Sequence, residues 1–127
     1  MISFMKVLIL IVHGSRDPKW RAPFERFCEE LKTSIGESLI HLCYMEIGTP
    51  RLGDVCSDLY ASGVRDARLV PLFMASGGHV DTDIPRQAAE VEAELDGFTL
   101  EIAGAIGEHP LIKAAMMNAL SDLCHNG

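Results

Sequence analysis

Four short apolar runs alternate with longer segments of helical spacing, and the alternation repeats about every thirty residues along the chain. Uninterrupted apolar runs of this length are typical of strands buried on both faces of a parallel sheet. Each strand-to-strand crossover in such a sheet is right-handed, and its helix covers apolar sheet surface. We therefore expect residues 1–127 to form a single α/β domain. The expected architecture is a three-layer sandwich with a four-stranded, mainly parallel sheet and helices on both faces.

The ends of the elements are marked by proline, glycine and capping residues. We expect strands at residues 6–12, 38–45, 69–74 and 99–103. The helices are expected to begin at Pro18 or Pro23, at Pro50, just after an N-cap at Asp83, and near Pro110. The side chains predicted to face the core are Trp20, Phe24, Phe27, Cys28, Leu31 and Ile35 in the first helix, Leu52, Val55, Cys56 and Leu59 in the second, Ala88, Val91 and Leu95 in the third, and Ile112, Met116, Leu120 and Leu123 in the last.

Composition excludes several classes of protein. The formal net charge of −7 argues against nonspecific nucleic-acid binding and against an anionic membrane surface, both of which favour a basic face. The apolar run near the N-terminus is too short to span a membrane and is better explained as the first strand. The four cysteines are scattered without a C-x-x-C pair, so we interpret them as small buried hydrophobes in a reducing, cytoplasmic setting.

Three polar residues follow three successive expected strands. His13, Glu46 and His79 are 33 residues apart in both intervals. Because the carboxyl ends of parallel strands lie along one edge of a sheet, we expect the three side chains to converge on one cleft. Two imidazoles and a carboxylate suit a divalent metal such as cobalt, nickel or ferrous iron, and the same groups could accept protons from a substrate.

Simpler explanations exist for each of these residues taken singly. A lone histidine in a loop is more often a surface or core residue than a ligand. Glu46 could pair with Arg51 or Lys6 at the end of its strand. The recurrence of the same design at three strand ends favours a shared site. His41, His109 and His125 lie mid-strand, before a proline and in the tail, and are weaker candidates.

A loop almost without side chains precedes His79. Ala75, Ser76, Gly77 and Gly78 would let a flat or bulky ligand approach the backbone at no steric cost. A helix that begins just after the histidine would point its first N–H groups back at this loop. We therefore expect the loop to form one wall of the predicted cleft.

Three motifs together resemble the sirohydrochlorin chelatase family, the CbiX/SirB type of class II chelatase. They are Val12-His13-Gly14-Ser15-Arg16, Glu46 with a proline four residues on, and Pro71-Leu-Phe-x-x-x-Gly-x-His79-x-x-x-Asp83-Ile-Pro85. The resemblance covers about residues 6–110, and the third motif is the specific one. It implies a chelatase-like fold and insertion of cobalt, iron or nickel into a reduced tetrapyrrole in cobalamin or siroheme biosynthesis.

The resemblance also implies roles for residues of this chain. His13 and His79 correspond to the family's metal-binding histidines, with His13 as the proton acceptor, and Glu46 to the carboxylate found in many relatives. Residues 75–78 correspond to the loop that contacts the macrocycle. The metal is a substrate, and no permanently bound cofactor is implied. Larger members contain two such units facing each other, so a chain with one unit is expected to form a homodimer.

Basic residues near the predicted site could offset the carboxylates of a tetrapyrrole, which an acidic protein would otherwise repel. The candidates are Arg16, Lys19, Arg21, Arg51 and Arg86, of which Arg16 and Arg51 are the predicted substrate-binding pair. An ordinary solvated surface is the competing explanation for each one.

Three other functions compete with that of a chelatase. A histidine phosphatase would need an arginine directly before the strand-end histidine, where this chain has Val12. A flavodoxin-like nucleotide binder would need a phosphate loop that the sequence lacks. A carrier that holds metal or tetrapyrrole without turnover would use the same ligands, so only a measurement of turnover separates it from a chelatase.

Overall fold

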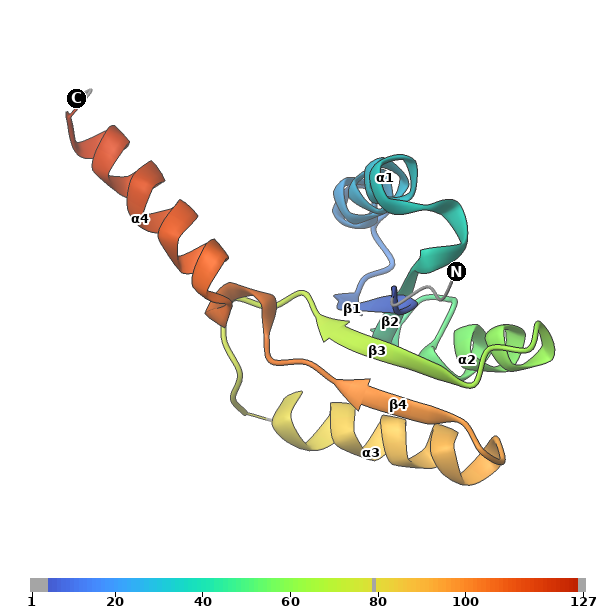
Figure 1. The fold of residues 1–127 in the computed structure, drawn as a ribbon. Coiled ribbons are helices and arrows are strands. Elements are labelled where there is room, and N and C mark those ends of the chain that lie inside the picture. The colour runs from blue at the N-terminus through green and yellow to red at the C-terminus, as the bar shows by residue number, and fades with distance from the viewer. Residues whose placement is uncertain (1–4, 79, 126–127) are drawn as a thin grey trace.

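The computed structural model describes residues 5–78 and 80–125. Strands and helices alternate along the chain as the sequence predicts (Figure 1). The elements are β1 (Leu8–Gly14), α1 (Pro18–Ile35), the 3₁₀ turn η1 (Glu37–Leu39), β2 (Ile40–Ile47), α2 (Leu52–Ala61), β3 (Asp66–Pro71), α3 (Val80–Glu94), β4 (Thr99–Ile102), the 3₁₀ turn η2 (Ile106–Glu108) and α4 (Pro110–His125). Within the described ranges, no helix is both long enough and apolar enough to cross a bilayer.

All pairings in the four-stranded sheet are parallel, in the order β2-β1-β3-β4. Alternate residues of β1 point to opposite faces of the sheet. Ile9 and Ile11 pack with residues of α2 and α3, whereas Leu10 packs with Cys28 of α1. Helices therefore lie on both faces, which confirms the predicted three-layer α/β architecture (Figure 1).

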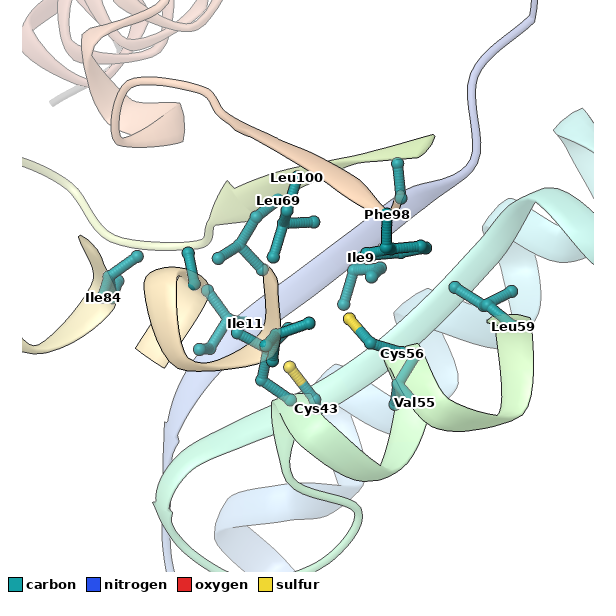
Figure 2. Packing of buried hydrophobic residues seen from close by; sticks show 14 of the residues in the cluster. Ile9, Ile11, Cys43, Val55, Cys56, Leu59, Leu69, Ile84, Phe98 and Leu100 are labelled. Atoms are coloured by element: carbon teal, nitrogen blue, oxygen red, sulfur yellow. The ribbon is translucent and has the colours of Figure 1, made fainter. Parts of the chain in front are cut away.

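The larger core lies between the sheet and the helices α2 and α3. Figure 2 shows Ile9 and Ile11 of β1 and Leu69 of β3 facing Cys56 of α2. The four residues predicted to face inward from α2 are all buried, as are Ala88 and Val91 of α3. The predicted inward faces of these two helices are therefore correct.

The inward face of α1 is narrower than its sequence predicts. Cys28 is its one fully buried residue, while Phe27 and Ile35 remain 47% and 40% exposed. The helix begins at Pro18, after the N-cap Asp17 whose side chain accepts a hydrogen bond from the Lys19 N–H at 2.9 Å. The prediction that Phe27 and Ile35 face the core is wrong, because α1 packs on the sheet along a single stripe.

The third strand lies earlier in the chain than predicted, over Asp66–Pro71 rather than residues 69–74. Its first half is amphipathic: Ala67 is buried, while Arg68 forms an ion pair with Glu101 of β4. A search for an unbroken apolar run misses such a segment. Residues 72–78 consequently form a loop beyond the sheet rather than the end of a strand.

Helix α3 begins at Val80, so Asp83 lies inside its first turn and is not the predicted N-cap. Pro85 is tolerated because, at the sixth position of the helix, it loses only the bond to the carbonyl of Asp81. The second strand is also shifted, to Ile40–Ile47, because residues 37–39 form the turn η1. Glu46 therefore lies inside β2 rather than after it.

The predicted start of the last helix near Pro110 is correct, but its predicted inward face is wrong. No residue of α4 is buried, and Leu111, Met117, Leu120 and Leu123 are 66–74% exposed. Figure 1 shows α4 projecting from the carboxyl end of the sheet, away from the rest of the domain. Helix α4 does carry the predicted apolar stripe, but the stripe is not buried in the core of its own domain.

Candidate functional site

His13 lies beside an irregularity in the pairing of β1 with β2. Val12 pairs with Tyr44 and Gly14 with Ile47, so the single residue His13 faces the two residues Met45 and Glu46. A bulge of this kind kinks the strand and redirects the side chains next to it. It brings the backbones of His13 and Glu46 side by side at the carboxyl end of the sheet.

Two side chains from α2 and α3 hold the bulge in place. The guanidinium of Arg51 donates to the carbonyl oxygen of Met45 at 2.8 Å, and the amide of Gln87 donates to the same oxygen at 3.0 Å. Buried polar groups need such partners, and a bulge interrupts the regular ladder that would supply them. Arg51, predicted to bind substrate, thus has a positioning role in the structure, and Gln87 has one that the sequence analysis missed.

The imidazole of His13 is half-buried and packs on the ring of Phe73, with 4.5 Å between ring centroids and 39° between planes. Phe73 in turn packs against the larger core. This contact limits the orientations that the imidazole can adopt. Phe73 belongs to the motif that precedes His79, but the sequence alone gives it no role.

The glycine after His13 is required by the close approach of two strands. Gly14 has a φ of +107°, and a Cβ at this position would collide with the carbonyl oxygen of Ile47. Beyond it, the Arg21 guanidinium donates to the Ser15 carbonyl at 2.8 Å. Arg21 therefore fastens the turn after His13, while Arg16 is exposed at that turn.

The loop at residues 74–78 is exposed and is anchored on both sides. The Ser76 hydroxyl donates to Glu108 of η2 at 2.9 Å, and the Gly77 N–H donates to the Asp81 carboxylate at 3.1 Å. Gly78 has a φ of +60°, a left-handed conformation that favours glycine, and a Cβ there would meet open space. The predicted macrocycle-contacting residues Ala75 to Gly78 thus form an open, side-chain-poor surface.

A hollow of about 180 Å³ lies behind this loop, between α3 and the end of β4. Phe73, Ser76, Asp81 and Ile84 are among its lining residues. A larger groove of about 580 Å³ runs along the edge strand β2 between α1 and α2, away from the strand-end residues. We place the candidate site at the first location, because the chemistry-bearing side chains lie there.

His79 lies outside the described residues, directly between Gly78 and the first residue of α3. In the part of the chain that the structure describes, no three His, Cys, Asp or Glu side chains gather as a metal site. The three-residue ligand set His13, Glu46 and His79 therefore stays a prediction. The structure does bring the backbones of His13 and Glu46 together and leads the loop toward position 79.

The other histidines make local contacts. His41 Nε2 lies 3.2 Å from the Ser38 carbonyl, and His125 Nδ1 lies 2.8 Å from the Ser121 carbonyl. His109 Nδ1 accepts a hydrogen bond from the Leu111 N–H at the start of α4. The low priority given to these three histidines agrees with their positions.

Three of the four cysteines are buried, as predicted, and Cys124 on α4 is exposed, which corrects the prediction for that residue. Burial raises the pKa of Cys43, and it raises the pKa of Cys56 to about 12. A buried thiol with a raised pKa is neither a nucleophile nor a good metal ligand. These residues therefore belong to the core.

The family model CbiX matches residues 7–123. The chloroplastic sirohydrochlorin ferrochelatase of Arabidopsis thaliana is 29% identical over 105 residues, which are 83% of this chain and 47% of that protein. The sirohydrochlorin cobaltochelatase of Saccharolobus solfataricus is 34% identical over 79 residues, which are 62% of this chain and 60% of that protein. The chain thus matches only about half to three fifths of the length of these relatives.

Solved structures match over more of the chain. The crystal structure of a CbiX protein from Marinobacter aquaeolei superimposes with a TM-score of 0.82 at 31% identity, covering 94% of this chain and 95% of that one. The sirohydrochlorin chelatase SirB from Bacillus subtilis, in complex with cobalt, gives a TM-score of 0.75 at 24% identity over 93% of this chain and 51% of that one, which shows a shared fold. Since the family model extends from β1 into the last turns of α4, the chain belongs to the CbiX family.

Proposed function

We propose that this protein is a sirohydrochlorin chelatase, which inserts a divalent metal ion into a reduced tetrapyrrole. The observation that carries the proposal is the bulge that sets Glu46 beside His13, whose ring packs on Phe73 just before the open loop. Relatives named as ferrochelatase and cobaltochelatase support the same reaction class. The metal is a substrate of this reaction.

Metal insertion has a simple proton balance: two pyrrole N–H protons leave for each divalent ion that enters. A neutral imidazole is a suitable acceptor near neutral pH. We assign the acceptor role to His13, whose ring is held on Phe73, and we assign stabilisation of the resulting imidazolium to Glu46 on the neighbouring strand. His79 is proposed as the second metal-binding histidine.

The loop of Ala75, Ser76, Gly77 and Gly78 is the proposed wall for the macrocycle. A planar ring needs a surface on which side chains do not hold it away from the backbone. Three of the five candidate cations are bonded within the protein: Arg21 to the Ser15 carbonyl, Arg51 to the Met45 carbonyl and Arg86 to Glu90. Arg16, exposed beside His13, is therefore the best candidate to meet a substrate carboxylate, with Arg51 as a second.

A homodimer is the proposed assembly. A macrocycle resting on one exposed loop needs a second wall, and a second copy of this single unit would supply it. Pairing of identical units about a two-fold axis is the commonest arrangement for oligomers of one chain. Cobalt and iron are the proposed metals, with nickel as a further candidate.

An anaerobic absorbance time course of the protein with sirohydrochlorin and Co²⁺, Fe²⁺ or Ni²⁺ tests the proposal. We expect insertion faster than in the protein-free control, with a rate proportional to protein concentration. The His13→Ala variant should lose about 10²-fold or more of this rate, on the scale of a lost general base. Glu46→Gln should slow insertion without preventing macrocycle binding.

The matched control is His41→Ala, which removes an imidazole that makes a local contact with the Ser38 carbonyl. It should insert metal at the wild-type rate. A His13→Ala variant with full activity would remove His13 from the reaction. Spectral evidence of binding without catalysed insertion by the wild-type protein would instead favour a carrier of metal or tetrapyrrole.

A further inference from the structure

Gln87 makes a hydrogen bond that joins α3 to the far side of the sheet. Helix α3, which carries Gln87, packs against α2 and β4 (Figure 1). The side-chain amide of Gln87 donates to the carbonyl oxygen of Met45 at 3.0 Å. Met45 belongs to β2, and β2 and β4 are the two opposite edge strands of the sheet. The bond therefore fixes α3 with respect to a strand at the other edge of the sheet.

The Met45 carbonyl has a hydrogen-bond partner even without Gln87. The Arg51 guanidinium, at the start of α2, donates to the same oxygen at 2.8 Å. A buried carbonyl has two lone pairs, but one accepted hydrogen bond is enough to avoid the cost of an unsatisfied group. Loss of the Gln87 donor should therefore leave the bulge bonded to α2 and change mainly the position of α3.

The two ends of the Gln87 bond lie next to two separate parts of the candidate site. Met45 directly precedes Glu46, and the bulge places this pair opposite His13. At the other end, α3 begins directly after residue 79, and Gln87 lies two turns inside it. The Asp81 carboxylate, in the first turn of α3, accepts the hydrogen bond from the loop N–H at position 77. Hydrogen bonds thus join the open loop to α3, and α3 to the bulge.

The other contacts of α3 define the position of this end of the helix less sharply. Its buried face is apolar, and apolar contacts are non-directional, so a helix can shift by a fraction of an ångström and keep them. Near the other end, the Glu92 carboxylate accepts from the Leu100 N–H at 2.8 Å, which fixes that end on β4. A hydrogen bond weakens steeply when its length or angle changes. Gln87 therefore supplies a directional restraint on the half of α3 that lies nearer the site.

We propose that Gln87 is a positioning residue that sets the distance between α3 and the pair of His13 and Glu46, and that this distance selects among divalent ions. The inference rests on the proposed function, in which His79, the residue before α3, also binds the ion. Sites discriminate between cobalt, nickel and iron largely through geometry, because affinity alone ranks these ions in the same order at most sites. Residues that orient metal ligands typically change affinity or activity by about 10–100-fold when they are substituted.

The first test measures metal insertion into sirohydrochlorin by two variants that each remove one donor to the Met45 carbonyl. Gln87→Met keeps the length of the side chain, and Arg51→Met leaves the bond to α3 in place. We expect Gln87→Met to lower kcat about 10-fold or more, with the tetrapyrrole KM within about twofold of wild type. It should also change the ratio of the Co²⁺ rate to the Ni²⁺ rate at least about threefold. Arg51→Met should leave this ratio unchanged.

The matched control is Glu90→Met, which places the same residue on α3 at an exposed position bonded to Arg86. It should insert each metal at the wild-type rate. A wild-type ratio of rates in Gln87→Met would overturn the proposal. The same altered ratio in Gln87→Met and Arg51→Met would also overturn it, because both variants would then act through the bulge alone and not through α3.

The second test uses Co²⁺ alone, so that its readout does not depend on turnover. The visible absorption of bound Co²⁺ reports the geometry of its ligands. We expect Gln87→Met to bind Co²⁺ about 10-fold more weakly and with a shifted spectrum, at a melting temperature close to that of the wild type. Gln87→Glu, which has the same shape but directs an acceptor at the Met45 carbonyl, should change the spectrum too. Wild-type spectra from both variants would contradict the proposal.

Hydrogen exchange followed by mass spectrometry tests the connection itself. In Gln87→Met, peptides that cover residues 74–84 should exchange at least about threefold faster than in the wild type, because local opening becomes easier when a restraint is removed. In Arg51→Met the same peptides should keep the wild-type rate. Unchanged exchange in Gln87→Met would show that packing alone holds α3 in place.

The three measurements separate this inference from the proposed function. A wild-type protein that binds Co²⁺ but never inserts it would refute the chelatase proposal. The role of Gln87 would then still be decided by the Co²⁺ spectra and by hydrogen exchange. A wild-type protein that inserts metal, with a Gln87→Met variant that matches it for every ion, would support the chelatase and refute the role of Gln87.

Discussion

Helices α2 and α4 carry similar apolar stripes, but the stripe of α2 is buried and that of α4 is not. In α2, the stripe Leu52, Val55, Cys56 and Leu59 lies against β1 and β2 and is buried (Figure 2). In α4, the stripe Ile112, Met116, Leu120 and Leu123 projects from the domain (Figure 1). The period of apolar residues is the same, so it shows that a face needs burial and not which surface buries it.

The difference between the two helices follows from their connections. Short links to β2 and β3 return α2 to the sheet, so its stripe meets the strands on either side of it in the sequence. Between β4 and residue 125 the structure describes no further strand, and the chain leaves the sheet through η2, which is held on Phe73 and Met74. No described strand therefore returns α4 to the sheet.

Thiol alkylation should show the largest contrast between the two helices. Cys56 of α2 is buried with a pKa raised to about 12, so near pH 8 only about 1 in 10⁴ of its thiols is ionised. Cys124 of α4 is exposed. In the native protein, iodoacetamide followed by mass spectrometry should modify Cys124 at least about 10³-fold faster than Cys56.

Denaturation supplies the control for this contrast. In about 6 M guanidinium chloride, Cys56 and Cys124 should react at similar rates, because unfolding removes the protection by burial. If Cys56 and Cys124 were alkylated at comparable rates in the native protein, α2 would have to open readily enough to expose Cys56 to solvent. The distinction between the two helices would then be lost.

Truncation of one leucine in each helix should give the next largest effect. Leu52→Ala leaves a cavity in the core and should lower the free energy of unfolding by about 2–5 kcal/mol. Leu120→Ala, measured at a low protein concentration, should lower it by about 0.5 kcal/mol or less, as is usual at an exposed position. Urea titration followed by circular dichroism at low micromolar concentration measures both.

The same pair of variants sharpens the comparison when protein concentration is raised. Dimerisation stabilises the folded chain by mass action, so Leu120→Ala should lose stability relative to the wild type only at concentrations where the dimer forms. A loss that is already complete in the monomer would show that α4 packs on its own domain. That result would restore the prediction made from the sequence.

The sequence predicted the sheet well because its strands are local features. An apolar run such as residues 8–12 forms a strand that is buried in the sheet. Each strand is joined to the next by a short crossover through a helix, and such a crossover favours parallel pairing. Strand ends were less accurate. Asp66 and Arg68 interrupt the apolar pattern at the start of β3, so the strand was predicted to begin too late. Pro85 suggested that α3 begins after Asp83, whereas it begins earlier, at Val80.

The predicted ligand set of the candidate site stays a prediction, and the contacts that support the site were not predicted. The equal spacing of His13, Glu46 and His79 suggested one position on three units, but the bulge at Met45 and Glu46 has no signature in a single sequence. Gln87 reaches Met45 from 42 residues away. Contacts between distant segments depend on the completed fold, so periodicity and local motifs cannot identify them.

The smallest expected effect concerns an exposed ion pair on the sheet, in contrast to the core that α2 covers. Hydrogen bonds from Lys6 and Arg68 lower the pKa of the Glu101 carboxyl below its ordinary value of 4.5. A carboxyl with a lowered pKa contributes stability above the unfolded-state value and loses it as the pH falls through the folded-state value. Glu101→Gln should therefore lower the unfolding free energy slightly at pH 7 and not at about pH 3.

Urea titrations of Glu101→Gln and of the control Glu94→Gln, at both pH values, measure this effect. Glu94 is an exposed carboxylate on α3, so its substitution should change stability little at either pH. The Glu101 effect should be small because water screens an exposed ion pair. Equal effects of Glu101→Gln and Glu94→Gln at pH 7 would show that the ion pair with Lys6 and Arg68 adds no stability of its own.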